Sequence, residues 1–342
     1  ATLCARISRH WVSIKLRRSS PTAKHTIDLV CRIWWADFWV LIFAPITDPG
    51  QNGETTRVCP SNNGRTKAMS KHFASLQKAL PQHLLSRVVG RLAQSRNPMI
   101  SAAFIKQFAR AYDISLAEAE RKKLSDYSSF NDFFTRALDP SARPMPDAIN
   151  ELASPVDGCV SQLGTIKDEH LFQAKGQRYA LRGLAGEASK GFEGGDFCTI
   201  YLAPSDYHRI HLPYAGTLTQ TIAYPGALFS VNGVTEEYIE GLFLRNERLV
   251  CRFETSFGPM LVVLVGALIV ASIETVWPGP ISPYPSMQIN PHNLPFERGA
   301  EIGRFLLGST VICCFPRGAV RLKQSLQVGG RVRMGEALGD LL

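Results

Sequence analysis

The sequence predicts an α+β protein in which N-terminal amphipathic helices precede a β-rich body. Apolar residues recur at helical spacing between residues 72 and 122, whereas short β-branched runs divided by Gly and Pro follow from residue 151. The 342 residues suffice for one large or two small domains with a buried core. We therefore expect three regions, which span residues 1–68, 69–150 and 151–342.

Residues 1–68 differ from the rest of the chain. Residues 1–27 are rich in Arg and Lys and lack acidic residues, as in a transit peptide, and residues 47–68 are polar and expected to be disordered. The apolar run 29–43 contains Arg32 and Asp37, each of which costs about 2.5–3.5 kcal/mol at a membrane centre, so we expect no transmembrane helix. We interpret residues 1–68 as a non-native upstream extension before Met69; a cleaved organellar presequence is the alternative.

The charge distribution bears on the class of partner. The chain carries a net charge of +9, but residues 1–68 hold ten Lys and Arg against four Asp and Glu, which leaves only +3 for residues 69–342. This excess suits a surface that meets anionic lipid, although it is equally compatible with an ordinary soluble surface. It is too small to indicate nucleic-acid binding.

The segment 72–122 predicts two helices separated at Asn97-Pro98. Both helices have a basic side, which leaves two interpretations open: a helix packed on its own domain, or an interfacial helix on an anionic membrane. A shorter helix is predicted at Phe130–Arg136, with Ser128 or Ser129 as its N-cap.

The β-rich region has several predicted strands. The apolar run Met260–Ile273 is too short to span a membrane and rich in Val, so it predicts buried strands. The eight cysteines form no C-x-x-C pair and no zinc-like Cys/His cluster, which predicts no metal site and reduced thiols. Adjacent Cys313 and Cys314 are expected on opposite faces of one strand. The other predicted strands are Cys159–Ile166, Phe197–Leu202, Leu249–Phe253 and Leu326–Val332.

Four side chains have the chemistry of nucleophilic acyl transfer. Ser309 follows Gly308, whose lack of a side chain leaves its carbonyl open to attack. Asp157 lies in a predicted turn, and His208 and His211 lie three residues apart on a predicted strand or loop. Taken alone, each position is typical of a turn or packing residue. Together they supply a serine, a carboxylate and two imidazoles with pKa values near neutrality.

The Gly308–Ser309 bond can undergo self-cleavage if a base assists the serine. The hydroxyl adds to the Gly308 carbonyl, and the acyl group moves from nitrogen to oxygen. The resulting ester loses the Gly308 carboxylate by β-elimination, which leaves dehydroalanine. Hydrolysis then gives a pyruvoyl group and ammonia. A base is needed because a serine hydroxyl alone is a weak nucleophile.

A series of motifs across residues 70–342 resembles the phosphatidylserine decarboxylase family of the bacterial type. The motifs occur in the family's order, and they end in the Leu-Gly-Ser-Thr cleavage motif. The matching segments are Phe130–Arg136, Ser154–Gly158, Gln173–Gly176, Tyr201–Pro213, Pro225–Asn232, Arg245–Arg248, Phe257–Met260, Val265–Ala267, Ser272–Trp277 and Gly303–Thr310.

The resemblance implies roles for the four side chains. Asp157, His211 and Ser309 would be orienter, general base and nucleophile of self-cleavage between Gly308 and Ser309. Cleavage would leave a β chain ending at Gly308 and an α chain of 34 residues beginning with the pyruvoyl group made from Ser309. His208 would lie beside that group and, with His211, is a candidate for proton transfer.

The resemblance also implies a complete activity. The pyruvoyl cofactor of the β-rich catalytic domain 151–342 would form a Schiff base with phosphatidylserine, release CO2 and give phosphatidylethanolamine, without a metal. Residues 69–150 would be the membrane-associating helices of a peripheral enzyme on the cytoplasmic face of the cell membrane. Its partners would be phosphatidylserine in an anionic membrane, its own α and β chains and a second subunit of a homodimer.

Residues 278–297 depart from the family pattern, because this stretch is shorter and contains no Lys or Arg. Its role in substrate or membrane contact is left open. Three rival functions also remain: a non-catalytic lipid-binding relative, a pyruvoyl decarboxylase of a soluble amino acid, and a serine hydrolase. A serine hydrolase would be expected to have a G-x-S-x-G motif, which the sequence around Ser309 lacks.

Overall fold

The computed structural model describes residues 82–173, 177–231, 233–267, 273–280, 282–306 and 309–342, which belong to one compact unit. For 83–85 and 233–234 it describes the backbone alone. The expectations for residues 1–68 and for Gly308 therefore lie outside the described residues.

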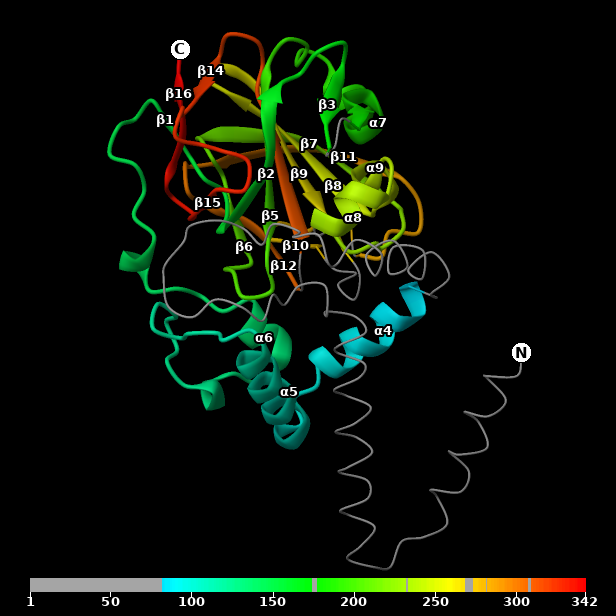
Figure 1. Cartoon of the computed structure of the whole chain (residues 1–342), viewed down its shortest axis with the longest axis vertical. Helices are drawn as coiled ribbons and strands as arrows, with labels where there is room; N and C mark the ends of the chain where they lie inside the picture. Colours follow the sequence, from blue (N-terminus) through cyan, green and yellow to red (C-terminus); the bar gives the residue numbers. More distant parts are fainter. Residues whose placement is uncertain (1–81, 174–176, 232, 268–272, 281, 307–308) are drawn as a thin grey trace, which may run out of the picture. The chain divides into compact units, whose positions relative to one another are not determined.

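Two helices begin the described chain (Figure 1). Helix α4 spans Gln82–Ala93, and α5 spans Pro98–Ala111. Asn97 caps α5, since its side-chain oxygen accepts a hydrogen bond from the Met99 amide at 3.0 Å. The predicted break at Asn97-Pro98 is thus confirmed.

Helix α6, Phe130–Phe134, packs against α5. Its N-cap is Ser129, whose hydroxyl accepts a hydrogen bond from the Asp132 amide. Phe130 stacks on Phe104 with ring centroids 4.1 Å apart. The apolar face of α5 is therefore buried within its own domain. A short 3-10 turn precedes α6 at Leu124–Asp126 (η1), and another follows it at Pro140–Ala142 (η2).

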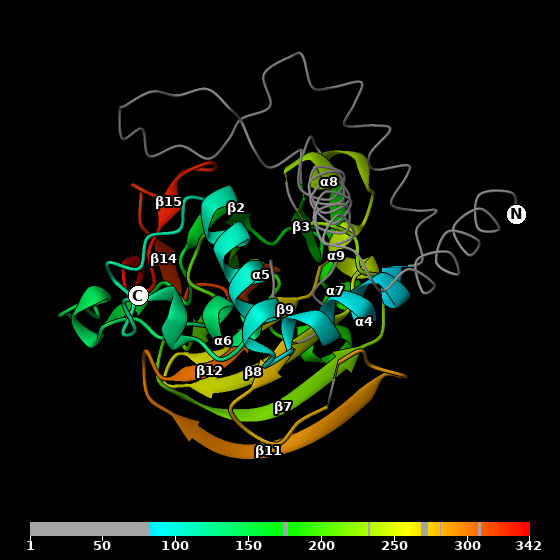
Figure 2. The same cartoon turned by 90° about the horizontal axis from the view of Figure 1, so that it is seen from below.

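The β-rich body is built on one eight-stranded sheet, in which all neighbouring strands are antiparallel (Figures 1 and 2). In spatial order the strands are β11 (Gln288–Phe296), β7 (Gly216–Tyr224), β8 (Arg248–Thr255), β9 (Gly258–Val265), β13 (Ser309–Cys314), β5 (Asp196–Leu202), β2 (Gly158–Thr165) and β15 (Arg331–Val332).

Each face of this sheet has its own apolar core. Cys313 joins one buried cluster and Cys314 the other, which confirms that they point to opposite faces of β13. Short helices contribute to the Cys314 cluster, and small sheets contribute to the Cys313 cluster. The helices are α7 (Leu181–Ala185), α8 (Gly233–Tyr238) and α9 (Leu242–Arg245), with η3 at Gly186–Ser189.

Two three-stranded sheets border the Cys313 side, and a two-stranded sheet completes the body. Strand β16 (Ala337–Leu341) lies between β1 (Glu151–Ala153) and β14 (Val320–Leu322). Strand β12 (Glu301–Phe305) lies between β10 (Ile273–Thr275) and β6 (Arg209–His211). The remaining pair is β3 (His170–Phe172) with β4 (Arg178–Ala180).

The predicted strands are confirmed over the described residues with one exception. Within the run Met260–Ile273, β9 ends at Val265 and β10 begins at Ile273, and residues 268–272 lie outside the described structure. The prediction for Leu326–Val332 is wrong over most of its length, because only Arg331 and Val332 form a strand. Two consecutive turns take up the rest: Leu326 donates to the Lys323 carbonyl and Gly330 to that of Gln327. Gly329, at φ 85°, adopts a left-handed conformation that interrupts a strand.

Four buried cysteines, 198, 251, 313 and 314, are free, as expected. Cys159 is disulfide-bonded, so the expectation of reduced thiols is wrong at that position. Among the described residues no helix is both long and apolar enough to cross a membrane.

Candidate active site

His208 lies in the segment that connects β5 to β6, and His211 is the last residue of β6. Ser309 is the first residue of β13 and pairs in register with Leu202, the last residue of β5. A turn follows, in which the Asp206 amide donates to the Ala203 carbonyl. The chain then passes through His208 into β6, and the Phe305 amide donates to the His208 carbonyl at 2.9 Å.

Ser309 is fully buried and its hydroxyl has no hydrogen-bond partner within the described structure. An unpaired buried hydroxyl costs on the order of 1–3 kcal/mol, and most buried polar groups in folded proteins have a partner. Ser309 is buried because the β-branched and sulfur-containing residues that follow it form a central strand between β5 and β9.

His208 is also fully buried, with one ring nitrogen engaged and one free. Nδ1–H donates to the Asp206 carbonyl at 2.8 Å, which fixes the tautomer because a carbonyl can only accept. Nε2 has no partner among the described residues, and the Phe134 ring lies against the imidazole at 4.0 Å between centroids. Burial lowers the pKa of His208 to about 3, so the ring is neutral at pH 7.

His211, at the end of β6, has both ring nitrogens engaged. Nδ1–H donates to the Gly299 carbonyl at 2.8 Å, and Nε2 accepts from the Tyr207 hydroxyl at 3.1 Å. Burial lowers the pKa of His211 as well. Nε2 therefore carries the lone pair that can accept a proton.

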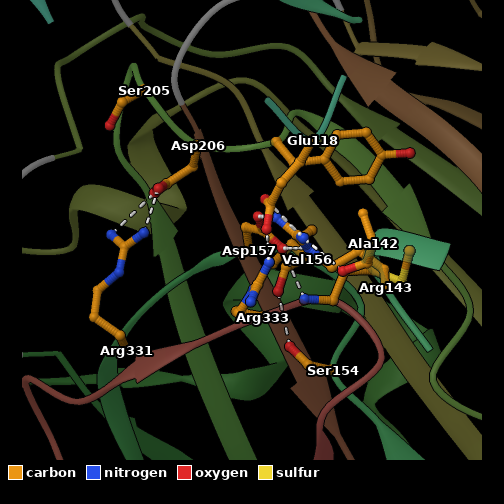
Figure 3. A network of polar contacts seen from close by, with 12 residues as sticks. Glu118, Ala142, Arg143, Ser154, Val156, Asp157, Ser205, Asp206, Arg331 and Arg333 are labelled. Carbon is orange, nitrogen blue, oxygen red and sulfur yellow. Dashed lines mark hydrogen bonds and ion pairs between the residues drawn. The ribbon is translucent and has the colours of Figure 1, made fainter. Parts of the chain in front are cut away.

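Asp157 lies in the bend before β2, and its carboxylate faces Arg143 (Figure 3). Arg143 binds both carboxylate oxygens, with Nε–Oδ1 at 2.8 Å and Nη2–Oδ2 at 2.5 Å, and the Met334 amide donates to Oδ1 at 2.8 Å. Within the described residues no hydrogen bond joins Asp157 to His211. Its negative charge nevertheless works against the larger effect of burial on the pKa of His211.

The segment after Ser309 is bound to the segment before it by polar contacts close to these residues. Arg331 donates to the Asp206 carboxylate, with Nη2–Oδ1 at 2.5 Å (Figure 3). Arg333 pairs with Glu118, which also pairs with Arg143 at 2.9 Å. Asp206 thus supports His208 through its carbonyl and holds the C-terminal segment through its carboxylate.

The sequence alone did not single out Arg143, Tyr207, Gly299 or Arg331 as site residues. Arg143 appeared only as part of an Arg-Pro pair, and its partner is fourteen residues away. Tyr207 stands next to His208 in the sequence, so a search for hydroxyl donors beside the histidines would have found it. No group of three His, Cys, Asp or Glu side chains among the described residues is placed to hold a metal ion.

Comparisons with known proteins identify the family to which the chain is similar. Residues 130–340 match the family model described as phosphatidylserine decarboxylase, and residues 72–113 match a second model described as PSD. The chain is 50% identical over 285 residues to a phosphatidylserine decarboxylase proenzyme of Shewanella sp. (strain ANA-3), covering 80% of this chain and 98% of the relative. The proenzyme of Hahella chejuensis is 48% identical over 277 residues, 79% and 94% of the two chains. That of Psychrobacter cryohalolentis is 50% identical over 271 residues, 78% and 98%.

Proposed function

Because the chain belongs to the phosphatidylserine decarboxylase family, we propose that it is a proenzyme that cleaves itself between Gly308 and Ser309 and then decarboxylates phosphatidylserine. The buried, unpartnered hydroxyl of Ser309 is the observation that supports this function most directly. A hydroxyl without a partner has no hydrogen bond to lose when it attacks a carbonyl.

His211 is the base that we assign to self-cleavage. Nε2 accepts the proton of Ser309, directly or through the Tyr207 hydroxyl to which it is hydrogen-bonded. Its Nδ1–H bond to Gly299 holds the ring while this proton arrives. Asp157 contributes negative charge that stabilises the imidazolium, from a position fixed by Arg143. This assignment modifies the simple triad, in which Asp157 would bind His211 itself.

The surroundings of Ser309 suit the pyruvoyl group that would replace it. The position is fully buried, and the free Nε2 of His208 offers a hydrogen-bond acceptor that no described side chain uses. The pyruvoyl group supplies a carbonyl that withdraws electrons from the carbon that loses CO2.

His208 moves the proton in the decarboxylation that we propose. The free lone pair on Nε2 receives the proton that the substrate amine gives up as it reacts. The same nitrogen returns the proton to the substrate carbon after CO2 has left. The Asp206 carbonyl holds the ring by its other nitrogen throughout.

The start of α5 is the surface that we assign to the membrane. Met99 is 83% exposed and Ile100 is 42% exposed; exposed Arg96 lies just before α5, and exposed Lys106 lies further along it. Apolar side chains beside basic ones fit the boundary of an anionic bilayer. Binding at the cytoplasmic face and the homodimer remain predictions from the family resemblance, which vesicle flotation and sedimentation analysis can test.

Intact mass spectrometry of the full chain, beside Ser309→Ala, tests the proposed function. We expect the unsubstituted chain to give a fragment that starts at residue 309 and adds hydroxylamine through its pyruvoyl ketone, and Ser309→Ala to stay whole. The cleaved protein should release CO2 from phosphatidylserine vesicles. An uncut, inactive chain in both samples would refute self-cleavage and favour a non-catalytic lipid-binding relative.

A further inference from the structure

Arg136 is a buried guanidinium that lacks an acidic partner in the described structure. The residue is 5% exposed, and its one hydrogen bond runs from Nη2 to the Ser205 carbonyl at 2.9 Å. Nε and Nη1 are buried and have no partner among the described residues. A buried cation with two unpaired nitrogens is costly, so these donors are expected to serve a ligand.

This guanidinium lies beside the histidine assigned to proton transfer. The segment 134–136 packs along the segment 205–209: Phe134 contacts His208, and Arg209 Nε donates to the Thr135 carbonyl at 2.9 Å. After burial and the Asp206 contact, the charge of Arg136 is a further influence on the pKa of His208, which it lowers. The two free nitrogens are therefore close to the reacting end of the site.

The neighbouring carboxylates are already paired with other arginines. Glu118, Asp157 and Asp206 each bind at least one guanidinium, and Arg136 is not among their partners. Those partners are Arg143, Arg331 and Arg333. Arg136 thus supplies positive charge in excess of the acids around it, which suits an anionic ligand.

We propose that Arg136 binds the phosphodiester of the phospholipid headgroup and so orients the substrate against His208. The assignment of that substrate rests on the proposed function. Of the two anions in phosphatidylserine, the phosphodiester keeps its charge through the reaction. The carboxylate loses its charge as CO2 departs, so a cation that bound it tightly would stabilise the ground state and slow the reaction.

Calorimetric titration with dioctanoyl phosphatidylmethanol tests this site, because that lipid has a phosphodiester but neither amine nor carboxylate. The titration uses the full chain after self-cleavage, with Arg136→Gln, Arg136→Lys and the exposed control Arg321→Gln. We expect Kd to rise about tenfold to a hundredfold in Arg136→Gln, less in Arg136→Lys, and to stay unchanged in Arg321→Gln. Absence of binding by the unsubstituted protein, or one Kd for all variants, overturns the proposal.

The KM for dioctanoyl phosphatidylserine distinguishes the two anions. A rise in KM in Arg136→Gln without a change in Kd for phosphatidylmethanol would assign Arg136 to the carboxylate and overturn the proposal. Arg136→Gln could instead have a Tm more than about 5 °C below that of Arg321→Gln, with binding lost in Arg136→Lys as well. That result would show that Arg136 has a structural role, and it would also overturn the proposal. Binding that depends on Arg136 in a protein that releases no CO2 would refute the proposed function and leave the anion site standing.

Discussion

The buried pair between Arg143 and Asp157 allows a direct test of how Asp157 acts. The two side chains are 7% and 9% exposed, and the guanidinium binds both carboxylate oxygens. Replacing Arg143 with Gln leaves the carboxylate buried with only the Met334 amide as a described partner. Loss of one member of a buried ion pair costs about 3–5 kcal/mol, and we expect a loss of that size.

Urea unfolding of uncut protein measures this loss without interference from self-cleavage. Ser309→Ala is the common background for Arg143→Gln, Asp157→Asn and the double variant. Arg143→Gln leaves the Asp157 charge unpaired, and Asp157→Asn leaves Arg143 only its more exposed partner Glu118. The double variant should therefore be more stable than the two losses added together predict, by about 2 kcal/mol or more. Arg121→Gln is a matched control, since its two-point pair with Asp132 is about one-third exposed and is expected to contribute less than about 1 kcal/mol.

Two results would refute the reasoning. Losses that add to within about 0.5 kcal/mol would show that Arg143 and Asp157 do not stabilise each other. In protein that retains Ser309, normal self-cleavage in Arg143→Gln together with none in Asp157→Asn would show that Asp157 acts independently of its arginine. We expect both changes to slow cleavage, because either one removes the fixed carboxylate near His211.

Three further predictions follow from single contacts. His208→Gln should reduce the loss of unfolding free energy on acidification from about pH 6.5 to pH 3. The pKa of the buried ring is about 3, so in this window the unfolded chain binds a proton that the folded chain does not, which costs up to about 1.4 kcal/mol per pH unit. Urea unfolding at several pH values measures this dependence, and the same slope in both proteins would contradict the prediction. Tyr207→Phe should raise the pKa of His211, because it removes a hydrogen-bond donor to the neutral ring. The acid limb of the pH profile of the self-cleavage rate should then move to higher pH. An unchanged acid limb would exclude His211 as the base. Gly158→Ala should prevent folding, since its Cβ would lie 2.4 Å from the Tyr201 carbonyl oxygen. The control Gly90→Ala should raise Tm, because its Cβ has no neighbour within 4 Å and Ala favours a helix. Soluble, cleaved Gly158→Ala protein would contradict the close approach of β2 and β5.

The sequence predicted those parts of the fold that local patterns determine. The cap at Ser129, the break before Pro98 and the alternation at Cys313 and Cys314 each depend on a few adjacent residues, and each is confirmed. The failure at Leu326–Val332 has a local cause too, since paired turns outweighed the β-branched residues.

The contacts of the site could not be predicted in this way, because they join segments far apart in the chain. Ser309 and Leu202 are neighbours only because β13 inserts between β5 and β9. In the same way, no local sequence pattern indicates that Asp157 binds Arg143 rather than His211. Residue types therefore indicated the histidines, the aspartate and the serine as candidates, whereas their partners could be found only in the fold.

Asp206 contacts both the histidine that we propose for proton transfer and the C-terminal segment. Its carbonyl fixes the tautomer of His208, and its carboxylate binds Arg331, which lies beyond the proposed cut. The Met334 amide, also beyond the cut, binds Asp157. Breaking the Gly308–Ser309 bond would thus leave the new chain held by these contacts and by strand pairing, which joins β13 to β5 and β9, β15 to β2, and β16 to β1. If the cleaved α chain moved away, Asp206 would lose its contact with Arg331. The hydrogen bond that orients the free nitrogen of His208 comes from the same residue, so it would be weakened too. The geometry of the proposed reacting site therefore depends on the binding of the segment that carries Ser309.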